Sequence, residues 1–396
     1  MRIALLENIH SVAKERLEER GHGVELFSSS FADDELVRLL KDFEAVGIRS
    51  KTKMTAEVLR ESSHLNAIGC FCIGTNQVDL SEAKRLGLPV FNAPYSNTRS
   101  VAELVLCEMV ALSRKLFDMS SYVHQGRWQK SAQGSFEVRG KTLGIIGYGH
   151  IGSQVSILAE AFGLKVQFFD IVKKLPLGNS VQAESMNDLL KTSDFVTLHV
   201  PETPETQGMM GSSQIAMMKK GAYLINASRG SVVDLTALRD SLNNEHLAGA
   251  AVDVYPSEPK KNSEGFESEL QGCPNMILTP HIGGSTQEAQ YNIGMEVSES
   301  LHQFIQQGQT MGAVEFPNLN PPQQIRGHRL LNVHKNVPGV LGDINSIVSQ
   351  AGINIHSQLL ATDDEIGFLL MDIEKGYQEA FEKISQLETN IKTRLL

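Results

Sequence analysis

Short apolar runs alternate with amphipathic segments along the first part of the chain. The apolar runs lie at residues 2–6, 45–48, 65–69 and 90–92, and residues 11–20 carry apolar positions at helical spacing. Such runs predict strands, whereas the helical period predicts an amphipathic helix. Because strands that alternate with helices form parallel sheets, we predict a small α/β domain at residues 1–96.

A long apolar helical pattern follows the first domain and runs on through Leu116. After Lys141, the alternation of strands and helices is repeated, with apolar runs at 143–147, 166–170, 195–198, 222–226, 249–254 and 276–278. This order predicts a doubly wound parallel sheet of the Rossmann type, in a domain that we assign to residues 97–284. A further helix follows Ser285. Because the first domain would otherwise be incomplete, we expect residues 285–318 to return to it.

The end of the chain has a pattern of its own. Pro317, Pro321 and Pro322 indicate a linker, which we place at residues 319–325. In residues 326–396, strand patterns at 330–334, 354–361, 367–373 and 391–396 enclose helical patterns at 339–351 and 377–387. This β-α-β-β-α-β order is typical of a ferredoxin-like fold. So small a unit, without obvious catalytic chemistry, indicates a regulatory or interaction module.

A glycine-rich turn follows the first strand of the second domain. Gly147, Gly149 and Gly152 stand in a Gly-x-Gly-x-x-Gly arrangement, and Asp170 ends the next strand. Gly147 allows the tight turn, Gly149 lets backbone N–H groups approach a pyrophosphate, and Gly152 lets the helix pack on the strand. Asp170 can hydrogen-bond the ribose hydroxyls and repel a 2′-phosphate. The pattern predicts a dinucleotide site that prefers NAD to NADP.

Arg229, Glu258 and His281 each follow a predicted strand of this domain. In open α/β sheets, functional side chains lie beyond the carboxyl ends of the strands. Arg229 can bind a carboxylate through two hydrogen bonds, and His281 can accept a hydroxyl proton as hydride leaves the same carbon. Glu258 can fix the histidine tautomer and raise its pKa. Taken singly, a surface arginine, a solvated glutamate and a helix-capping histidine are the alternatives.

The segments that carry these residues resemble a known family. Residues 226–230, 252–259 and 279–284 resemble the signature loops of the D-isomer-specific 2-hydroxyacid dehydrogenases. The resemblance implies Arg229, Glu258 and His281 as the catalytic set, no metal, and a discontinuous, flavodoxin-like first domain. Besides the residues of the glycine turn and Asp170, it implies NAD contacts at His150, Ile151, Ala227, Ser228, Asp253, Gly283 and Gly284.

Residues 69–80 and 91–103 resemble the family members that act on a phosphorylated 2-hydroxy acid in L-serine biosynthesis. A phosphate requires cations, and Arg49, Ser50 and Lys51 follow the predicted strand 45–48, although a solvated basic loop is the alternative. Lys51 stands where a second arginine is expected, and it binds phosphate only as a point charge. Asn97 is either a further substrate contact or a helix cap.

Residues 334–341 and 352–355 resemble ACT domains. The resemblance implies that His334, Asn336 and Asn354 bind L-serine as an effector between two such domains, within a homotetramer. By itself, an asparagine beside a Pro-Gly turn is usually turn chemistry.

Composition narrows the classes of function. A net charge of −10 and a hydrophobic content of 41% describe an ordinary globular protein and argue against broad nucleic-acid binding. The first residues are charged too soon for a signal peptide, no run approaches a membrane span, and the four cysteines show no Cys-x-x-Cys spacing. We expect a cytoplasmic enzyme without nucleic-acid or membrane partners. A 2-oxoglutarate reductase, another D-2-hydroxyacid dehydrogenase and an NAD-sensing binding protein remain as alternatives.

Overall fold

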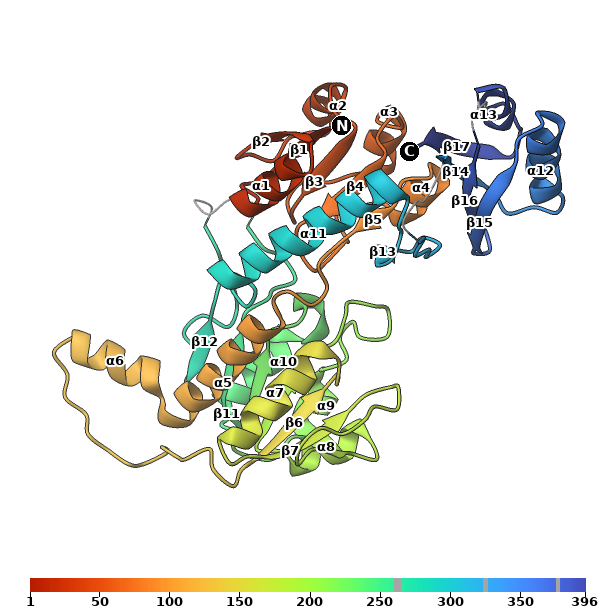
Figure 1. Cartoon of the computed structure of the whole chain (residues 1–396). Helices are drawn as coiled ribbons and strands as arrows, with labels where there is room; N and C mark the ends of the chain where they lie inside the picture. The colour runs from red at the N-terminus through yellow and green to blue at the C-terminus, as the bar shows by residue number, and fades with distance from the viewer. Residues whose placement is uncertain (260–264, 323–326, 375–377) are drawn as a thin grey trace. The chain divides into compact units, whose positions relative to one another are not determined.

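The computed structural model of the chain describes residues 1–259, 265–322, 327–374 and 378–396. The described backbone divides into two compact units (Figure 1). One unit comprises Met1–Ser96 and Gln290–Leu396, and the other comprises Asn97–Ala289.

The first unit contains a mainly parallel sheet with the strand order β13-β5-β4-β3-β1-β2. Its members are β1 (Arg2–Leu5), β2 (Gly23–Leu26), β3 (Ala45–Ile48), β4 (Ala67–Cys70), β5 (Val90–Phe91) and β13 (Ala313–Val314). Only β13 is antiparallel to its neighbour. The order β2-β1-β3-β4-β5 is that of flavodoxin-like folds. The sequence pattern missed β2 because this edge strand buries only Val24.

Helices cover both faces of this sheet. One face is packed by α2 (Asp33–Leu40), α3 (Ala56–Glu61) and α4 (Leu80–Arg85). The other face is packed by α1 (Ser11–Glu19) and by α11 (Gln287–Gln307), whose buried residues include Val297 and Phe304. Among the described residues, no helix, α11 included, combines the length and the apolar character that a membrane span requires.

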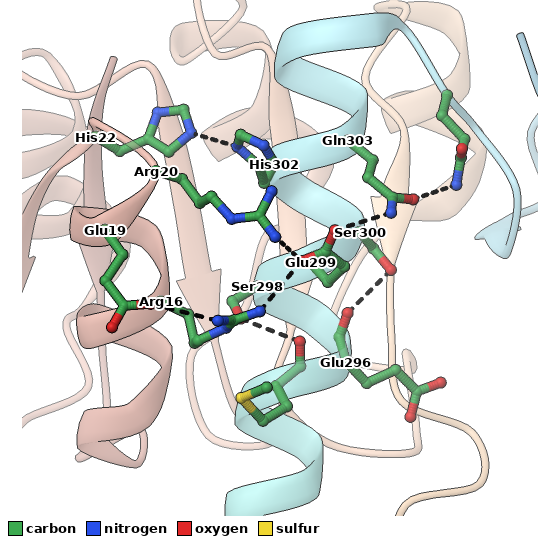
Figure 2. A network of polar contacts seen from close by, with 12 residues as sticks. Arg16, Glu19, Arg20, His22, Glu296, Ser298, Glu299, Ser300, His302 and Gln303 are labelled. Carbon is green, nitrogen blue, oxygen red and sulfur yellow. Dashed lines mark hydrogen bonds and ion pairs between the residues drawn. The ribbon is translucent and has the colours of Figure 1, made fainter. Parts of the chain in front are cut away.

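Polar contacts also join α11 to α1 (Figure 2). The Glu299 carboxylate lies 3.2 Å from the Arg20 guanidinium and 3.9 Å from that of Arg16. Next to them, His22 Nε2 lies 3.1 Å from His302 Nδ1. Burial of the imidazole lowers the pKa of His22 to about 4, and burial also lowers the pKa of His302. The two distant segments are therefore matched by charge at the surface and by apolar side chains beneath it.

The second unit is built on a seven-stranded parallel sheet with the order β12-β11-β10-β9-β6-β7-β8. Its strands are β6 (Thr142–Ile146), β7 (Lys165–Phe169), β8 (Val181–Gln182), β9 (Phe195–Leu198), β10 (Ala222–Asn226), β11 (Leu247–Val252) and β12 (Met276–Leu278). The predicted doubly wound sheet is confirmed, with the short edge strand β8 in addition. The order of the strands reverses between β6 and β9, which is where such sheets bind ligands.

Helices lie on both faces of the second sheet. One face is packed by α5 (Thr98–Arg114) and α7 (His150–Ala161). The opposite face is packed by α8 (Met186–Thr192), α9 (Ser212–Met217) and α10 (Leu235–Asn243).

The predicted long helix up to Leu116 is wrong in its last part. Helix α5 ends at Arg114 because Lys115 adopts a left-handed conformation with φ 50°, and a separate helix, α6 (Leu116–His124), follows. None of the residues of α6 is buried, and Figure 1 shows this helix projecting to one side of its unit. Phe117 is 55% exposed and Trp128, just beyond the helix, is 82% exposed.

The C-terminal module has the predicted β-α-β-β-α-β order. It consists of β14 (His328–Lys335), α12 (Val340–Gln350), β15 (Ile355–Thr362), β16 (Ile366–Ile373), α13 (Gln378–Ser385) and β17 (Asn390–Leu395). The strands form an antiparallel sheet with the order β15-β16-β14-β17. Residues 323–325 of the predicted linker, Arg326, and Tyr377 at the predicted start of the last helix lie outside the described residues.

One face of the C-terminal sheet packs against α12 and α13. Side chains of its other face, including Val333 and Phe368, belong to the same apolar cluster as α11 and the flavodoxin-like sheet. The Lys392 ammonium donates to the carbonyl oxygens of Ser63 and Leu65. Within its unit, the module therefore shares a continuous core with the first domain.

Candidate active site

The glycine-rich turn lies between β6 and α7. Gly147 has φ 90°, and a Cβ atom there would lie 2.3 Å from the carbonyl oxygen of His199. A Cβ atom on Gly152 would lie 2.2 Å from the carbonyl oxygen of Gly147. Larger residues would clash at both positions. A Cβ on Gly149, in contrast, would meet no atom within 4 Å, so the backbone of the turn is open to a ligand at this point.

The N-cap position of α7 is occupied by a glycine, which has no side chain that could cap the helix. Gly149 is its N-cap residue and forms no side-chain cap hydrogen bond, while His150 and Ile151 begin the helix. Unsatisfied N–H groups and the helix dipole favour an anion at such an end. The Asp170 carboxylate, just after β7, accepts N–H bonds from Tyr148 and Val172, each at 2.9 Å. The open glycine, the uncapped helix and this nearby carboxylate fit a bound dinucleotide.

The loop after β10 is ordered by the Asn226 side chain. Its Oδ1 atom accepts hydrogen bonds from the N–H and the hydroxyl of Ser228, and its Nδ2 atom donates to the Arg229 carbonyl. A Cβ on Gly230 would lie 2.0 Å from the carbonyl carbon of Tyr255. The loop that carries Ala227, Ser228 and Arg229 is therefore in close contact with the loop that follows β11.

His281 and Glu258 form a hydrogen-bonded pair. The His281 Nδ1 atom lies 2.9 Å and 3.0 Å from the two carboxylate oxygens of Glu258. The side chains are 52% and 35% exposed, respectively. The hydrogen bond to Glu258 raises the pKa of His281, although burial opposes this. Burial alone would raise the pKa of Glu258, but the bond and the charge of His281 lower it.

Asp253 fixes the loop that carries His281. This carboxylate is only 2% exposed. It accepts hydrogen bonds from the Thr279 hydroxyl at 2.6 Å and from the N–H groups of Ile282 and Gly283, both at 2.8 Å. His281 itself has φ 55°, in the left-handed region. The contacts on both sides of His281 therefore hold a backbone conformation that is unfavourable for a residue with a Cβ atom.

Asn97 also lies in this region. It occupies the N-cap position of α5, but its side chain makes no cap hydrogen bond, so the capping alternative is wrong. Its Nδ2 atom lies only 2.6 Å from where a Cβ on Gly284 would stand. Within the described structure, its buried Oδ1 atom has no hydrogen-bond partner. The described structure thus leaves this amide oxygen as an unsatisfied buried acceptor.

Glu108 is a buried acid that the sequence analysis missed. It lies on the inner face of α5, is 3% exposed, and among the described residues neither carboxyl oxygen has a hydrogen-bond partner. Burial, and to a smaller extent the charge of Asp253, raises the pKa of Glu108 to about 8. The sequence does contain a signal for its burial, because the spacing from Val101, Val105 and Leu112 places Glu108 on the apolar side of the helix.

The candidate substrate residues Arg49, Ser50 and Lys51 belong to the first unit, in the loop after β3. Arg49 is half-buried, whereas Ser50 and Lys51 are exposed. Their N–H groups are partly held by the carboxylate of Glu7, which accepts from Arg49 and from Lys51.

The candidate effector residues differ in accessibility. Asn336 and Asn354 are exposed, and the Asn336 amide donates to the Asp363 carbonyl at 2.6 Å. His334 is only 3% exposed, and its Nδ1 atom lies 2.8 Å from Asn332 Oδ1. Burial lowers the pKa of His334. A Cβ on Gly367 would lie 2.2 Å from its Nε2 atom, so the ring packs over the neighbouring strand.

Comparison with known proteins agrees with this geometry. Residues 106–283 match the NAD-binding domain of the D-isomer specific 2-hydroxyacid dehydrogenases, and residues 330–392 match an AHAS small subunit-like ACT domain. Over its whole length the chain is 54% identical to the D-3-phosphoglycerate dehydrogenase of Dictyostelium discoideum and 49% identical to that of Escherichia coli K12, covering 97% of each.

Solved structures show the same likeness. The D-lactate dehydrogenase from Aquifex aeolicus, complexed with NAD and lactic acid, aligns with a TM-score of 0.67 at 29% identity, over 76% of this chain and 95% of that one. The chain belongs to the D-isomer specific 2-hydroxyacid dehydrogenase family. It is an NAD-dependent oxidoreductase, and the predicted fold class and cofactor are confirmed.

Replacing Glu108 by Gln is expected to raise the free energy of unfolding by about 1–3 kcal/mol near pH 7.5. With its pKa raised from 4.5 to about 8, the folded carboxyl keeps a proton that the unfolded chain releases. Its contribution to stability is complete below the unfolded pKa and is lost as pH rises toward 8. Gln resembles the protonated form and removes this dependence.

Denaturant unfolding at mildly acidic and mildly alkaline pH measures the effect. Glu103→Gln is the matched control, because Glu103 lies on the same helix with a side chain that is 60% exposed. Equal pH dependence in the parent and in Glu108→Gln would contradict the prediction.

Proposed function

We propose that the chain oxidises the C2 hydroxyl of D-3-phosphoglycerate with NAD, giving 3-phosphohydroxypyruvate in the first step of L-serine biosynthesis. The observation that carries this proposal is the His281–Glu258 pair, with Nδ1 2.9 Å from the carboxylate, at the strand ends of a dinucleotide-binding sheet. The substrate is suggested by the D-3-phosphoglycerate dehydrogenases to which the whole chain is similar.

His281 is the proposed general base. Because Nδ1 is engaged with Glu258, Nε2 is the atom that accepts the hydroxyl proton. Glu258 orients the ring and stabilises the imidazolium that forms. NAD held at the glycine-rich turn would supply the acceptor for the C2 hydride. The Arg229 guanidinium binds the substrate carboxylate through two hydrogen bonds and so orients C2.

The cofactor and the phosphate have separate proposed contacts. Arg49 and Lys51 supply positive charge for the phosphate group, Ser50 supplies a hydroxyl, and Asn97 is a further substrate contact. The proposed NAD contacts are Gly147, Gly149, His150, Ile151, Gly152, Asp170, Ala227, Ser228, Asp253, Gly283 and Gly284.

Regulation and assembly complete the proposal. We propose L-serine as the effector, bound by Asn336 and Asn354 with help from His334, between C-terminal modules of two subunits of a cytoplasmic homotetramer. Strand β15 lies at an edge of the module's sheet, and an unpaired strand edge is suited to pairing with a second copy. Exposed Phe117 and Trp128 on and beside α6 favour a second contact between copies.

The first prediction from this proposed function concerns turnover. Consumption of NADH with 3-phosphohydroxypyruvate should be rapid and should be suppressed by L-serine. It should also be faster than with 2-oxoglutarate, because only 3-phosphohydroxypyruvate carries a phosphate for the basic loop, residues 49–52 after β3. Absorbance at the NADH band measures the rates. Faster turnover of 2-oxoglutarate would support the reductase alternative, and NADH binding without turnover would support an NAD sensor.

A second prediction concerns pH. Because the bond to Glu258 raises the pKa of His281, the base form appears at higher pH in the parent than it would without Glu258. Glu258→Gln should therefore shift the rise of kcat/KM for oxidation to lower pH and reduce its maximum about 10- to 1,000-fold. Glu269→Gln, which removes an exposed carboxylate 3.0 Å from Arg239, is the control. An unchanged midpoint would contradict the assigned roles.

A third prediction concerns assembly. Trp128→Ser combined with Phe117→Ser should reduce the molar mass in solution, because it removes apolar surface from a contact between copies. Light scattering after gel filtration measures this mass. Leu175→Ser, at a position of the same unit that is 79% exposed, should leave the mass unchanged. A parent mass that equals one chain would refute the proposed assembly.

A further inference from the structure

Glu7 is a buried acid that has no role in the proposed chemistry. It stands just beyond the end of β1 and is only 8% exposed. Its Oε1 atom accepts hydrogen bonds from the N–H groups of Arg49 at 3.1 Å and Thr52 at 2.8 Å, and Oε2 accepts from Lys51 at 3.0 Å. One carboxylate thus holds three backbone donors of the loop that follows β3.

The backbone at Glu7 is strained. Glu7 and Asn8 both lie in the left-handed region, with φ of 62° and 52°. Each such residue costs about 1–2 kcal/mol, and conformations of this kind persist only where the surroundings hold them. The contacts to the basic loop, with the bonds from the N–H groups of Glu7 and Asn8 to the carbonyls of Ser29 and Phe27, provide that support.

The same loop is held from a third strand end. Gln77, in the segment after β4, donates from Nε2 to the Arg49 carbonyl at 2.9 Å and to the Gly74 carbonyl at 3.2 Å. Strands β1, β3 and β4 are neighbours in the sheet. The main chain of the basic loop is therefore fixed on its N–H side by Glu7 and on its carbonyl side by Gln77.

Within the part of the chain that the structure describes, the cationic groups of Arg49 and Lys51 form no hydrogen bond. Among the described residues, the hydrogen bonds formed by Arg49 and Lys51 all involve main-chain atoms. If Glu7 were paired with the Arg49 guanidinium, it would compete with an anionic ligand for the same donors. Because Glu7 binds backbone N–H groups instead, it orders the loop while both cations remain available for a ligand.

We propose that Glu7 is a positioning residue for the phosphate of the substrate. It acts through the backbone of residues 49–52, which it holds so that the cations of Arg49 and Lys51 converge on that group. This proposal rests on the proposed function, in which the same loop binds the phosphate.

Glu7→Gln tests the proposal with little change in side-chain volume. The amide retains one acceptor oxygen, but its NH2 group faces a backbone N–H that then lacks a partner. We expect KM for 3-phosphohydroxypyruvate to rise about 5- to 50-fold, since charged hydrogen bonds that order the binding loop are lost. Both kcat and the KM for NADH should stay within about 2-fold of the parent values. A raised KM with an unchanged kcat indicates the loss of an interaction that is equally strong in the ground state and in the transition state.

A matched control separates positioning from general stability. Glu82 is similarly buried, at 7% exposure, and pairs with Arg60 at 2.8 Å on the same unit, away from the basic loop. Glu82→Gln should lower the melting temperature yet leave KM for 3-phosphohydroxypyruvate unchanged. If Glu7→Gln also changes only the melting temperature, Glu7 has a structural role alone and the proposal is overturned.

A double-mutant cycle with Arg49→Ala separates the positioning role of Glu7 from the phosphate contact of the loop itself. Residues that act as one unit give non-additive effects, so Glu7→Gln should raise KM by a smaller factor in the Arg49→Ala background, where Lys51 is the one cation left for Glu7 to position. Full additivity would overturn the action of Glu7 through this loop. If Arg49→Ala leaves KM unchanged, the Arg49 contact of the proposed function fails, and the action of Glu7 through Arg49 fails with it. If Arg49→Ala raises KM but Glu7→Gln does not, only the role of Glu7 fails.

Discussion

The carboxylate of Asp253 is the constraint on which the loop that carries His281 depends. It lies at the end of β11 and accepts three hydrogen bonds from the loop after β12. A buried charge is costly unless such donors surround it, so the carboxylate and the loop need each other. With the residues on both sides of His281 fixed, the ring can stay in contact with Glu258 in spite of its left-handed backbone.

Carboxylates serve the same purpose at two other strand ends. Asp170, after β7, accepts the Tyr148 N–H from the glycine turn, and Glu7, after β1, accepts three N–H groups from the basic loop. Loops at the carboxyl ends of parallel strands present backbone N–H groups that no ladder satisfies. An ionised carboxylate can accept several of them at once, which makes it an efficient tie between neighbouring loops.

The sequence predicted those features that leave a local signature. The apolar runs located the central strands because each strand is buried on both faces. The spacing of the three glycines located the turn, because a Cβ atom would clash at Gly147 and Gly152 and would have no neighbour within 4 Å at Gly149. The short edge strands β2 and β8 lack such a pattern. The partners of Glu7 and of Asp253 could not be predicted, because these contacts join segments that are distant in sequence. The break at Lys115 had no signal either, since no glycine or proline marks its left-handed turn.

The placement of α11 has a consequence for the order in which the protein is made. Its apolar residues complete the core that β1, β3 and β4 begin, but the ribosome must first translate the whole unit Asn97–Ala289. At about 5–20 residues per second, this takes roughly 10–40 seconds. During that interval α1 covers only part of one apolar face of the first sheet, whereas the NAD-binding unit is continuous in sequence and can fold as it emerges. The nascent chain therefore finishes its second unit before its first.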